Sequence, residues 1–572
     1  MKISLKCWTA GFALSAAALT VCDAYLRWPA EWSSSALLLV MLAVGAFLNG
    51  LYFSVKEKRM RVIALVYGVL FAAAQLCGER LENTQTLALN AGEVWLMLAG
   101  TALCAPAAGG LFALLVRLTE TVSADRSRKW NDRKVFWASA LILFVCWLPF
   151  LAAYYPGLYT YDVSYQFLQY NTGEINMHHP LLHTLLIGGF YDLGWHLFGY
   201  PVRGILMYAL FQMALLALAI AASVSCLCRC RAPRWTVLLA LACGALMPFN
   251  QLLSISTTKD TLFSAAVLWT TVLAFEAFRS PDTARSFGWK ARFALALCLT
   301  CLLRNNGFIC AAGLMLAGLL TLRQHPALGK RLLCLCVCAV VAYAAVNTGL
   351  QKATDAADGP KGEMFSVPAQ QLARVYVMTD DEAKPEIKAY LPGAPNYSHK
   401  LADFVKNTFD VENVSLPDFL KLWAEVGLRH PVIYLEAVAE TTRGFWHLDN
   451  TPAGQYLETA FHTDEANWLM EDSKWPELKK LATGLYSNNE YREIPLYSAV
   501  LAPAFWCRAL IWLMFAALYL RRKSVLYAGF AVLALYLTTL LGPCVMFRYI
   551  YPVALCVPFL FGCLLAEKER NA

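Results

Sequence analysis

Polar side chains that could carry out chemistry stand beside long apolar runs at several points of the sequence. An acidic residue, Asp162, and an amide, Gln166, follow the turn Tyr155-Pro156-Gly157. The other stretches contribute, in chain order, His178 and His179, Lys259 and Asp260, Arg304 with Asn305 and Asn306, and Arg548 with Tyr549. Ionisable groups at a membrane are costly unless they belong to a site or a structural pair. The sequence therefore predicts a polar site assembled from distant parts of the chain.

These residue types indicate a base and an anion clamp. A carboxylate such as Asp162, close to an aromatic-rich turn, can act as a general base. Arg304 and Arg548 can hold a phosphate through charge-assisted hydrogen bonds, because a guanidinium group matches phosphate in bidentate geometry. This combination suits a reaction on a lipid phosphate.

Each of these side chains also has a structural interpretation. Asp162 could be a turn residue, and Lys259 with Asp260 could be an ion pair that caps the next helix. Arg548 could extend its charge to lipid headgroups, and metal ligation by His178 and its neighbour would need two or three further ligands. What favours a site is that all these groups share one side of the expected topology.

The composition indicates a membrane protein. The 572 residues are 58% hydrophobic and only 15% charged, whereas soluble proteins average about 25% charged residues. This excludes a cytosolic enzyme, a disordered chain and a small secreted disulfide scaffold. The net charge of +8 is explained by topology signals in cytoplasmic loops, so no nucleic-acid partner is expected.

A membrane span needs roughly 20 mostly apolar residues. Fourteen ranges fit, although 290–303 is short and could be half of a broken helix with its successor. They are 7–24, 35–54, 62–78, 92–116, 135–153, 202–226, 235–253, 260–278, 290–303, 307–322, 332–350, 496–520, 524–541 and 548–566.

The loop charges set the expected orientation. With fourteen alternating spans, all the basic clusters fall on one side, which is expected to be the cytoplasm together with both termini. These clusters lie within 56–61, 126–134, 229–234, 285–292, 323–331 and 521–523. Residues 351–495 hold 14 Lys and Arg but 23 Asp and Glu and are placed on the outer side. The apolar stretch 181–198 carries His183, Asp192 and His196, and we place it on the outer surface as a re-entrant or interface-lying helix.

The expected architecture is an all-α integral membrane protein in four parts. Residues 1–134 form a four-span accessory module, which we call the N-terminal module. Residues 135–350 form the membrane core, with the outer loop 154–201 as its catalytic part. Residues 351–495 form an α-rich extracytoplasmic domain, and 496–572 add three spans to the core.

Over residues 135–572 the chain resembles the GT-C superfamily of polytopic glycosyltransferases, and within it a poorly characterised group of bacterial multi-pass proteins. The resemblance rests on short motifs. They are Tyr155-Pro156-Gly157 with Asp162 and Gln166, His178-His179-Pro180 with His183-Thr184, Lys259-Asp260-Thr261-Leu262-Phe263, Arg304-Asn305-Asn306-Gly307, Val367-Pro368-Ala369-Gln370-Gln371 and Phe547-Arg548-Tyr549. It implies a site in the bacterial plasma membrane that faces away from the cytoplasm.

The resemblance also implies roles. The donor would be a polyprenyl-phosphate-linked sugar, and the acceptor an envelope glycan, lipid or protein. Asp162 would be the general base, with Asp260 as the second acidic residue. Lys259, Arg304, Arg548 and Tyr549 would bind the donor phosphate, and the substrates would be positioned by Gln166, His178, His179, Asn305 and Asn306. Several subfamilies have a second acidic residue where Val163 stands here, which leaves a divalent metal ion possible.

Two other functions remain open from the sequence. A transporter or flippase of lipid-linked sugars would place ionisable residues near the middle of the membrane, often in repeated halves, and the sequence shows neither a clear repeat nor a charge pair within a span. A non-catalytic membrane protein of envelope assembly would keep its function after Asp162→Asn.

Overall fold

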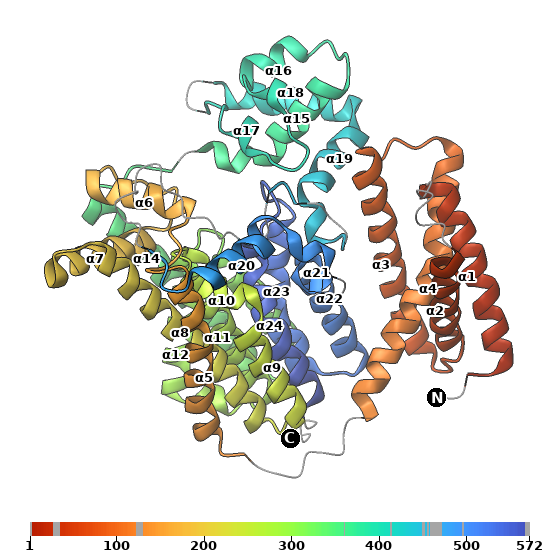
Figure 1. Ribbon diagram of the computed structural model, residues 1–572, viewed down its shortest axis with the longest axis horizontal. Coiled ribbons are helices and arrows are strands. Elements are labelled where there is room, and N and C mark those ends of the chain that lie inside the picture. Colours follow the sequence, from red (N-terminus) through yellow and green to blue (C-terminus); the bar gives the residue numbers. More distant parts are fainter. Residues whose placement is uncertain are drawn as a thin grey trace.

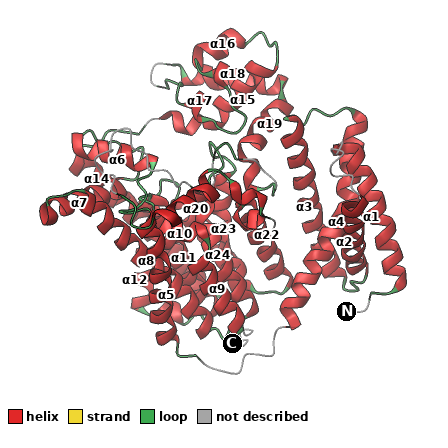
Figure 2. Ribbon diagram, viewed as in Figure 1, coloured by secondary structure: helices red, strands yellow, loops and turns green. Residues whose placement is uncertain are grey.

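The structure is a computed structural model, and it describes residues 3–26, 35–121, 130–359, 361–411, 414–448, 452–454, 457, 472–494 and 497–566. Within these ranges the regular elements are helices, and the only β contacts are isolated bridges (Figure 2). The predicted all-α membrane protein is therefore confirmed at this level.

Every range predicted as a span coincides with a helix or a pair of helices. Among the described residues, eight helices are long and apolar enough to cross a membrane. They are α1 (Leu5–Leu26), α3 (Lys58–Thr84), α4 (Ala91–Thr121), α5 (Asp132–Ala153), α8 (Val202–Arg229), α11 (Lys259–Arg279), α14 (Pro326–Thr354) and α24 (Phe547–Leu565). The other ranges fall on α2 (Ser35–Phe53), α9 (Arg234–Leu246) with α10 (Pro248–Ile255), α12 (Phe287–Leu303), α13 (Phe308–Thr321), α21 (Tyr497–Leu501) with α22 (Pro503–Tyr519), and α23 (Lys523–Thr539).

The range 235–253 is bent rather than straight. Helices α9 and α10 meet at an angle of 50°, and together they form one candidate span. Met247 between them is extended, with φ −69° and ψ 128°, because the ring of a following proline disfavours helical backbone. Pro248 then starts the second helix, where its missing N–H costs nothing.

The polar site rests on the two most enclosed spans. Most of the apolar window of α11 and of α24 is buried, 83% and 78%, against 17% for α1 and for α14. Lys259 is the first residue of α11, and Arg548 is the second residue of α24. The charged groups therefore stand at the ends of helices that their neighbours hold tightly.

Helix α7 (Leu181–Phe198) is not among the helices apolar enough to cross a membrane. It follows α6 (Tyr161–Thr172), and Figure 1 shows it at the left edge, at an angle to the long helices. Its first half is buried, whereas Trp195, Leu197 and Phe198 near its end are exposed. Large apolar side chains exposed on such a helix are typical of one that lies in the membrane interface.

The 351–495 domain forms its own small core at the top of Figure 1. Its helices are α15 (Ser366–Met378), α16 (Lys384–Tyr390), α17 (Asp403–Lys406), α18 (Leu416–Arg429) and α19 (Pro431–Thr442). Leu372, Ile387 and Phe419 lie in this core. Helix α20 (Pro476–Ser487) lies apart from this core and packs against α5, with Ala482 and Tyr486 in the main hydrophobic cluster. The end of α24 lies at the opposite end of the molecule from this domain (Figure 1).

Basic loops meet at that opposite end. The Arg59 guanidinium donates to the carbonyl of Leu518 at 2.6 Å, and Arg522 donates to the carbonyl of Ala566 at 2.9 Å. Lys523 donates to Gln324. Residues 126–129 of the predicted clusters lie outside the described residues. These contacts place loops that are far apart in sequence on one end of the molecule, as the charge pattern predicts.

The N-terminal module is bound to the 351–495 domain by buried charges. One Glu436 oxygen accepts hydrogen bonds from Leu87 N at 2.5 Å, Ala88 N at 3.2 Å and Thr86 Oγ1 at 2.7 Å, just beyond the end of α3. The other Glu436 oxygen pairs with Arg374 at 3.0 Å, and both side chains are almost fully buried. This module, to which the sequence assigned no purpose, therefore supports the domain above the membrane core.

A second set of charges extends this junction. Arg443 lies between Glu82 of α3 and Glu440 of α19, and its side chain is 1% exposed. His447 Nε2 lies 3.2 Å from Glu79 Oε2, one turn earlier on α3. The C-terminal end of α3 is thereby fixed to the domain through both Glu79 and Glu82.

Candidate active site

A tight turn brings two distant helix starts together. Gly157 has φ +145°, which L side chains rarely adopt, and a Cβ there would lie 3.2 Å from the carbonyl oxygen of Ile255. Next in the chain, Leu158 N donates to Ile255 O at 3.0 Å, and Thr257 N donates back to Leu158 O at 2.8 Å. The start of α6 is therefore held beside the start of α11, although about 100 residues separate them in sequence.

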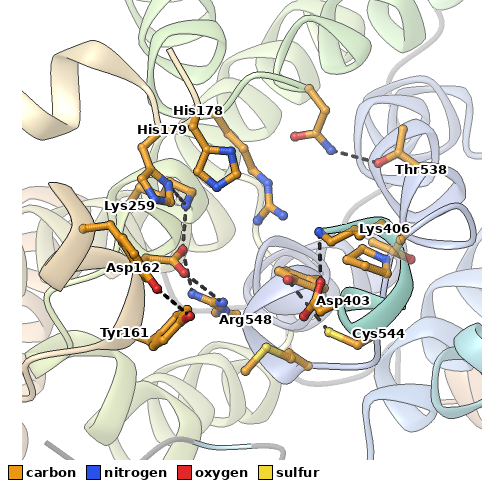
Figure 3. A pocket seen from close by; sticks show the side chains of 18 of the residues that line it. Tyr161, Asp162, His178, His179, Lys259, Asp403, Lys406, Thr538, Cys544 and Arg548 are labelled. Carbon is orange, nitrogen blue, oxygen red and sulfur yellow. Dashed lines mark hydrogen bonds and ion pairs between the residues drawn. The ribbon is translucent and has the colours of Figure 1, made fainter. Parts of the chain in front are cut away.

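Asp162 lies between two cations (Figure 3). Its Oδ2 accepts from Lys259 Nζ at 2.7 Å and from Arg548 Nη1 at 2.9 Å, and its Oδ1 accepts from Arg548 Nη2 at 3.3 Å. Burial alone would raise the pKa of Asp162, but the positive charges of Arg548 and Lys259 outweigh it and hold the pKa well below its usual range. The carboxylate is therefore a stable anion in this state.

A second ion pair stands beside the first. Arg304 pairs with Asp260, whose side chain is 1% exposed and also accepts from Thr258 Oγ1 at 3.1 Å. Arg548 Nη1 is 3.9 Å from the other oxygen of Asp260. The Tyr549 ring lies 5.0 Å from the Arg304 guanidinium and 5.4 Å from that of Arg548, within the range of cation–π attraction. Three cations face two carboxylates here, so this cluster favours an added anion.

His179 is held neutral. Its Nδ1 accepts from Lys259 Nζ at 3.1 Å, and the ring packs edge-to-face on His178 with centroids 4.5 Å apart. Burial, followed by the charge of Lys259, lowers the pKa of His179 to about 2. The ring can therefore accept a hydrogen bond but does not add a positive charge.

The described residues do not fit a divalent metal ion at this point. No group of three or more His, Cys, Asp or Glu side chains among them is arranged to hold one. Asp162 and Asp260 are each already bonded to a cation. A metal would therefore have to displace an ammonium or guanidinium group from each carboxylate.

The cluster opens into a cavity of about 1070 Å³. Most of the predicted site residues line it, namely Asp162, His178, His179, Lys259, Arg304, Asn306, Arg548 and Tyr549. Apolar lining comes from Phe263 of α11, Leu535 of α23 and Val553 of α24. The cavity therefore combines a charged region with an apolar wall made by the apolar helices α11, α23 and α24.

Three predicted site residues do not line the cavity. Asp260 is buried behind Arg304. Gln166 is fully buried, where it donates to Thr184 at 2.9 Å and bonds His183 Nδ1 at 3.0 Å. Asn305 is exposed and faces the backbone of His178 at 3.4 Å. A molecule in the cavity would therefore not touch these three side chains directly, and they contact neighbouring residues instead.

The Gln166 network explains the motif around His183. His183 bonds Gln166 through Nδ1 and the Tyr208 hydroxyl of α8 through Nε2 at 2.7 Å. Burial above all lowers the pKa of His183 to about 3, so the ring stays neutral. These bonds fix α6 against α7 and α8, and with α6 they fix Asp162.

One wall of the cavity was not foreseen from the sequence. Asp403 and Lys406 reach it from α17, on the side opposite Asp162 (Figure 3), and Asn407, the next residue after this helix, also lines the cavity. The segment is held in place because Ala402 N donates to Pro543 O at 2.9 Å, next to the bridge between Leu401 and Cys544. The polar 351–495 sequence has no periodic signal that would single out these residues.

The fold and the cavity define a multi-pass helical membrane protein with a charged, partly apolar pocket at one end. The chain belongs to the family of unknown function DUF6020, whose sequence profile matches residues 23–572. No curated protein and no solved structure matches it. The match includes most of the N-terminal module, so α2–α4 belong to the unit that this family shares.

Proposed function

We propose that the protein is a membrane glycosyltransferase of the GT-C type with fourteen spans. It would move a sugar from a polyprenyl-phosphate donor to an acceptor in the bacterial cell envelope. Both termini would be cytoplasmic, and the cavity would open on the extracytoplasmic side of the plasma membrane, beneath the 351–495 domain.

The observation that carries the proposal is the meeting of Asp162 with Lys259, Arg304 and Arg548 at one cavity. Their positions in sequence span nearly 400 residues. Lys259 and Arg548 contact Asp162 directly, and Arg304 contacts the neighbouring carboxylate Asp260. The excess of cations suits a phosphate, and the apolar wall of membrane helices suits an isoprenoid chain. A lipid phosphate has both parts, a phosphate for the charged region of the cavity and an apolar chain for its apolar wall.

The resting contacts indicate how the donor would activate the base. With Lys259 and Arg548 on it, Asp162 is a weak base. A donor phosphate attracts the same two cations. When either cation turns to the phosphate, less positive charge remains beside the buried carboxylate of Asp162. The pKa of Asp162 then rises toward a value suited to proton abstraction.

The chemical step follows from these positions. Asp162 takes the proton of an acceptor hydroxyl, and the hydroxyl oxygen forms a bond to the anomeric carbon of the sugar. The bond from that carbon to the phosphate oxygen breaks, and its electron pair stays on the lipid phosphate. Arg304 and Arg548 stabilise the charge that grows there, with Asp260 holding Arg304 in position. No step uses a metal ion.

The test is mass spectrometry of envelope glycans from a deletion strain and its parent. We expect a sugar to be missing in the deletion strain, restored by the wild-type gene and by Asp192→Asn, but not by Asp162→Asn. Asp192 is a matched control because it is an α7 carboxylate bonded by Tyr170, away from the cavity lining. Membrane levels of each variant are measured in parallel. Full restoration by Asp162→Asn would refute the assignment of the base.

A further inference from the structure

The wall of the cavity opposite Asp162 is used by no step above. Lys406 Nζ lies 2.9 Å from Asp403 Oδ1, and the Lys406 side chain is 7% exposed whereas that of Asp403 is 40% exposed. Asn407 follows directly and lines the same cavity. A half-exposed carboxylate, fixed by a buried ammonium group, therefore faces the space in which the acceptor would stand.

Two tyrosines line the cavity on the α6 side, next to Asp162 and across from Asp403. Tyr161 and Tyr165 are one turn apart on α6, their hydroxyls are 2.8 Å apart, and about half of each side chain is exposed. Their rings are perpendicular, with centroids 5.0 Å apart. The bond to Tyr165, then burial, then nearby carboxylates including Asp403 raise the pKa of Tyr161 to about 12. The Tyr161 hydroxyl therefore keeps its proton, and Asp403 is within electrostatic reach.

The charge of this wall differs from that of the phosphate region. Around Asp162 the cations outnumber the carboxylates, whereas here Lys406 is matched by Asp403. A matched pair does not select an anion. Asp403 offers a carboxylate that accepts hydrogen bonds, and the Asn407 amide both donates and accepts them. Tyr161 and Tyr165 add two apolar ring faces. Together these groups are complementary to a sugar ring, which carries hydroxyl groups around its edge and C–H bonds on its faces.

We propose that Tyr161 and Tyr165 on one side of the cavity and Asp403, Lys406 and Asn407 on the other form an acceptor site, here called the acceptor wall, and that the acceptor it binds is a carbohydrate. The inference rests on the proposed function, because it assigns the second substrate of the same cavity. The carboxylate of Asp403 would accept hydrogen bonds from neighbouring sugar hydroxyls, and a tyrosine ring would cover the C–H face of the sugar. A lipid or a protein as the acceptor would not need this set of groups.

The test uses labelled full-length protein in nanodiscs on an array of bacterial envelope oligosaccharides and methyl glycosides. Wild-type protein is expected to bind at least one class of saccharide. Asp403→Asn and Tyr165→Ala should each weaken this binding at least tenfold. Tyr165→Ala leaves the pair of Asp403 with Lys406 intact, which keeps the test valid if Asp403→Asn folds poorly. Tyr200→Ala, an exposed tyrosine away from the cavity lining, should bind as wild type does.

Arg548→Ala separates this inference from the function on which it rests. It should keep saccharide binding while losing binding of undecaprenyl phosphate, measured in the same nanodiscs. If the wall variants lose saccharide binding, the acceptor wall is supported. If Arg548→Ala at the same time binds the lipid phosphate as wild type does, the donor site is refuted. Absence of saccharide binding by the wild type, or unchanged binding by both wall variants, would overturn the acceptor wall.

Discussion

Replacement of Arg548 tests the donor site most directly. Its guanidinium group makes two hydrogen bonds to Asp162, at 2.9 and 3.3 Å, and the side chain is 11% exposed. Hydrogen bonds to charged groups contribute about 1.5–3 kcal/mol each. Because the guanidinium gives up its bonds to Asp162 when it turns to a phosphate, the lower end of that range applies. Arg548→Ala should therefore cost about 3 kcal/mol of binding free energy, roughly a hundredfold in affinity.

The assay is titration of undecaprenyl phosphate into full-length protein in nanodiscs at fixed ionic strength, with the uncharged polyprenol as the blank. Arg548→Lys keeps the charge but not the planar pair of donors, so it should fall between wild type and Arg548→Ala. Arg429→Ala is the matched control, because Arg429 pairs with Asp381 at 2.8 Å in the 351–495 domain and does not line the cavity. If Arg548→Ala binds the lipid phosphate within threefold of wild type, the proposed donor clamp is wrong.

Three further predictions concern the scaffold of the site. Gly157→Ala places a Cβ on a backbone with φ +145°, which costs about 1–3 kcal/mol; the midpoint of thermal unfolding should fall, and an unchanged midpoint would contradict the turn argument. Burial raises the pKa of Glu440 from 4.5 to about 7, so the folded state binds the extra proton and unfolding free energy should fall by about 3 kcal/mol as pH rises from 4.5 to 7. Glu440→Gln should remove that slope in thermal melts, and an unaltered slope would exclude Glu440 as its source. Arg374→Ala leaves Glu436 buried without its cation, at a cost of about 3–5 kcal/mol, so limited proteolysis near residues 85–90 should become faster; cleavage at the wild-type rate would mean that the junction does not depend on this pair.

The helices were readable from the sequence because apolar runs of span length have few alternatives. A backbone in lipid must satisfy its own hydrogen bonds, and a helix does so within one segment. The break between α9 and α10 was missed by counting apolar residues, although Met247-Pro248 carried the signal. By contrast, the polar residues from Arg304 onward predicted the separation of α12 from α13, and the structure has it.

The ion cluster was predictable only as a set of residues on one side. The actual pairs, Lys259 and Arg548 on Asp162 and Arg304 on Asp260, depend on the turn at Gly157 and on the packing of α11 against α24. Gln166 was expected to face a substrate, but its hydrogen bonds to Thr184 and His183 cross two helices and leave no periodic pattern. The wall at Asp403 depends on contact with Pro543, which is 140 residues away in the chain.

The junction between α3 and the 351–495 domain also sets an order of events during synthesis. Glu79 and His447, which meet there, are 368 residues apart, and chains grow at about 5–20 residues per second, so the earlier partner waits roughly 20 to 70 s for the later one. During that interval the C-terminal end of α3 carries the carboxylates of Glu79 and Glu82 before their partners Arg443 and His447 have been made. A chain whose synthesis stops before residue 440 therefore lacks the partners of these carboxylates, and the C-terminal end of α3 stays uncovered.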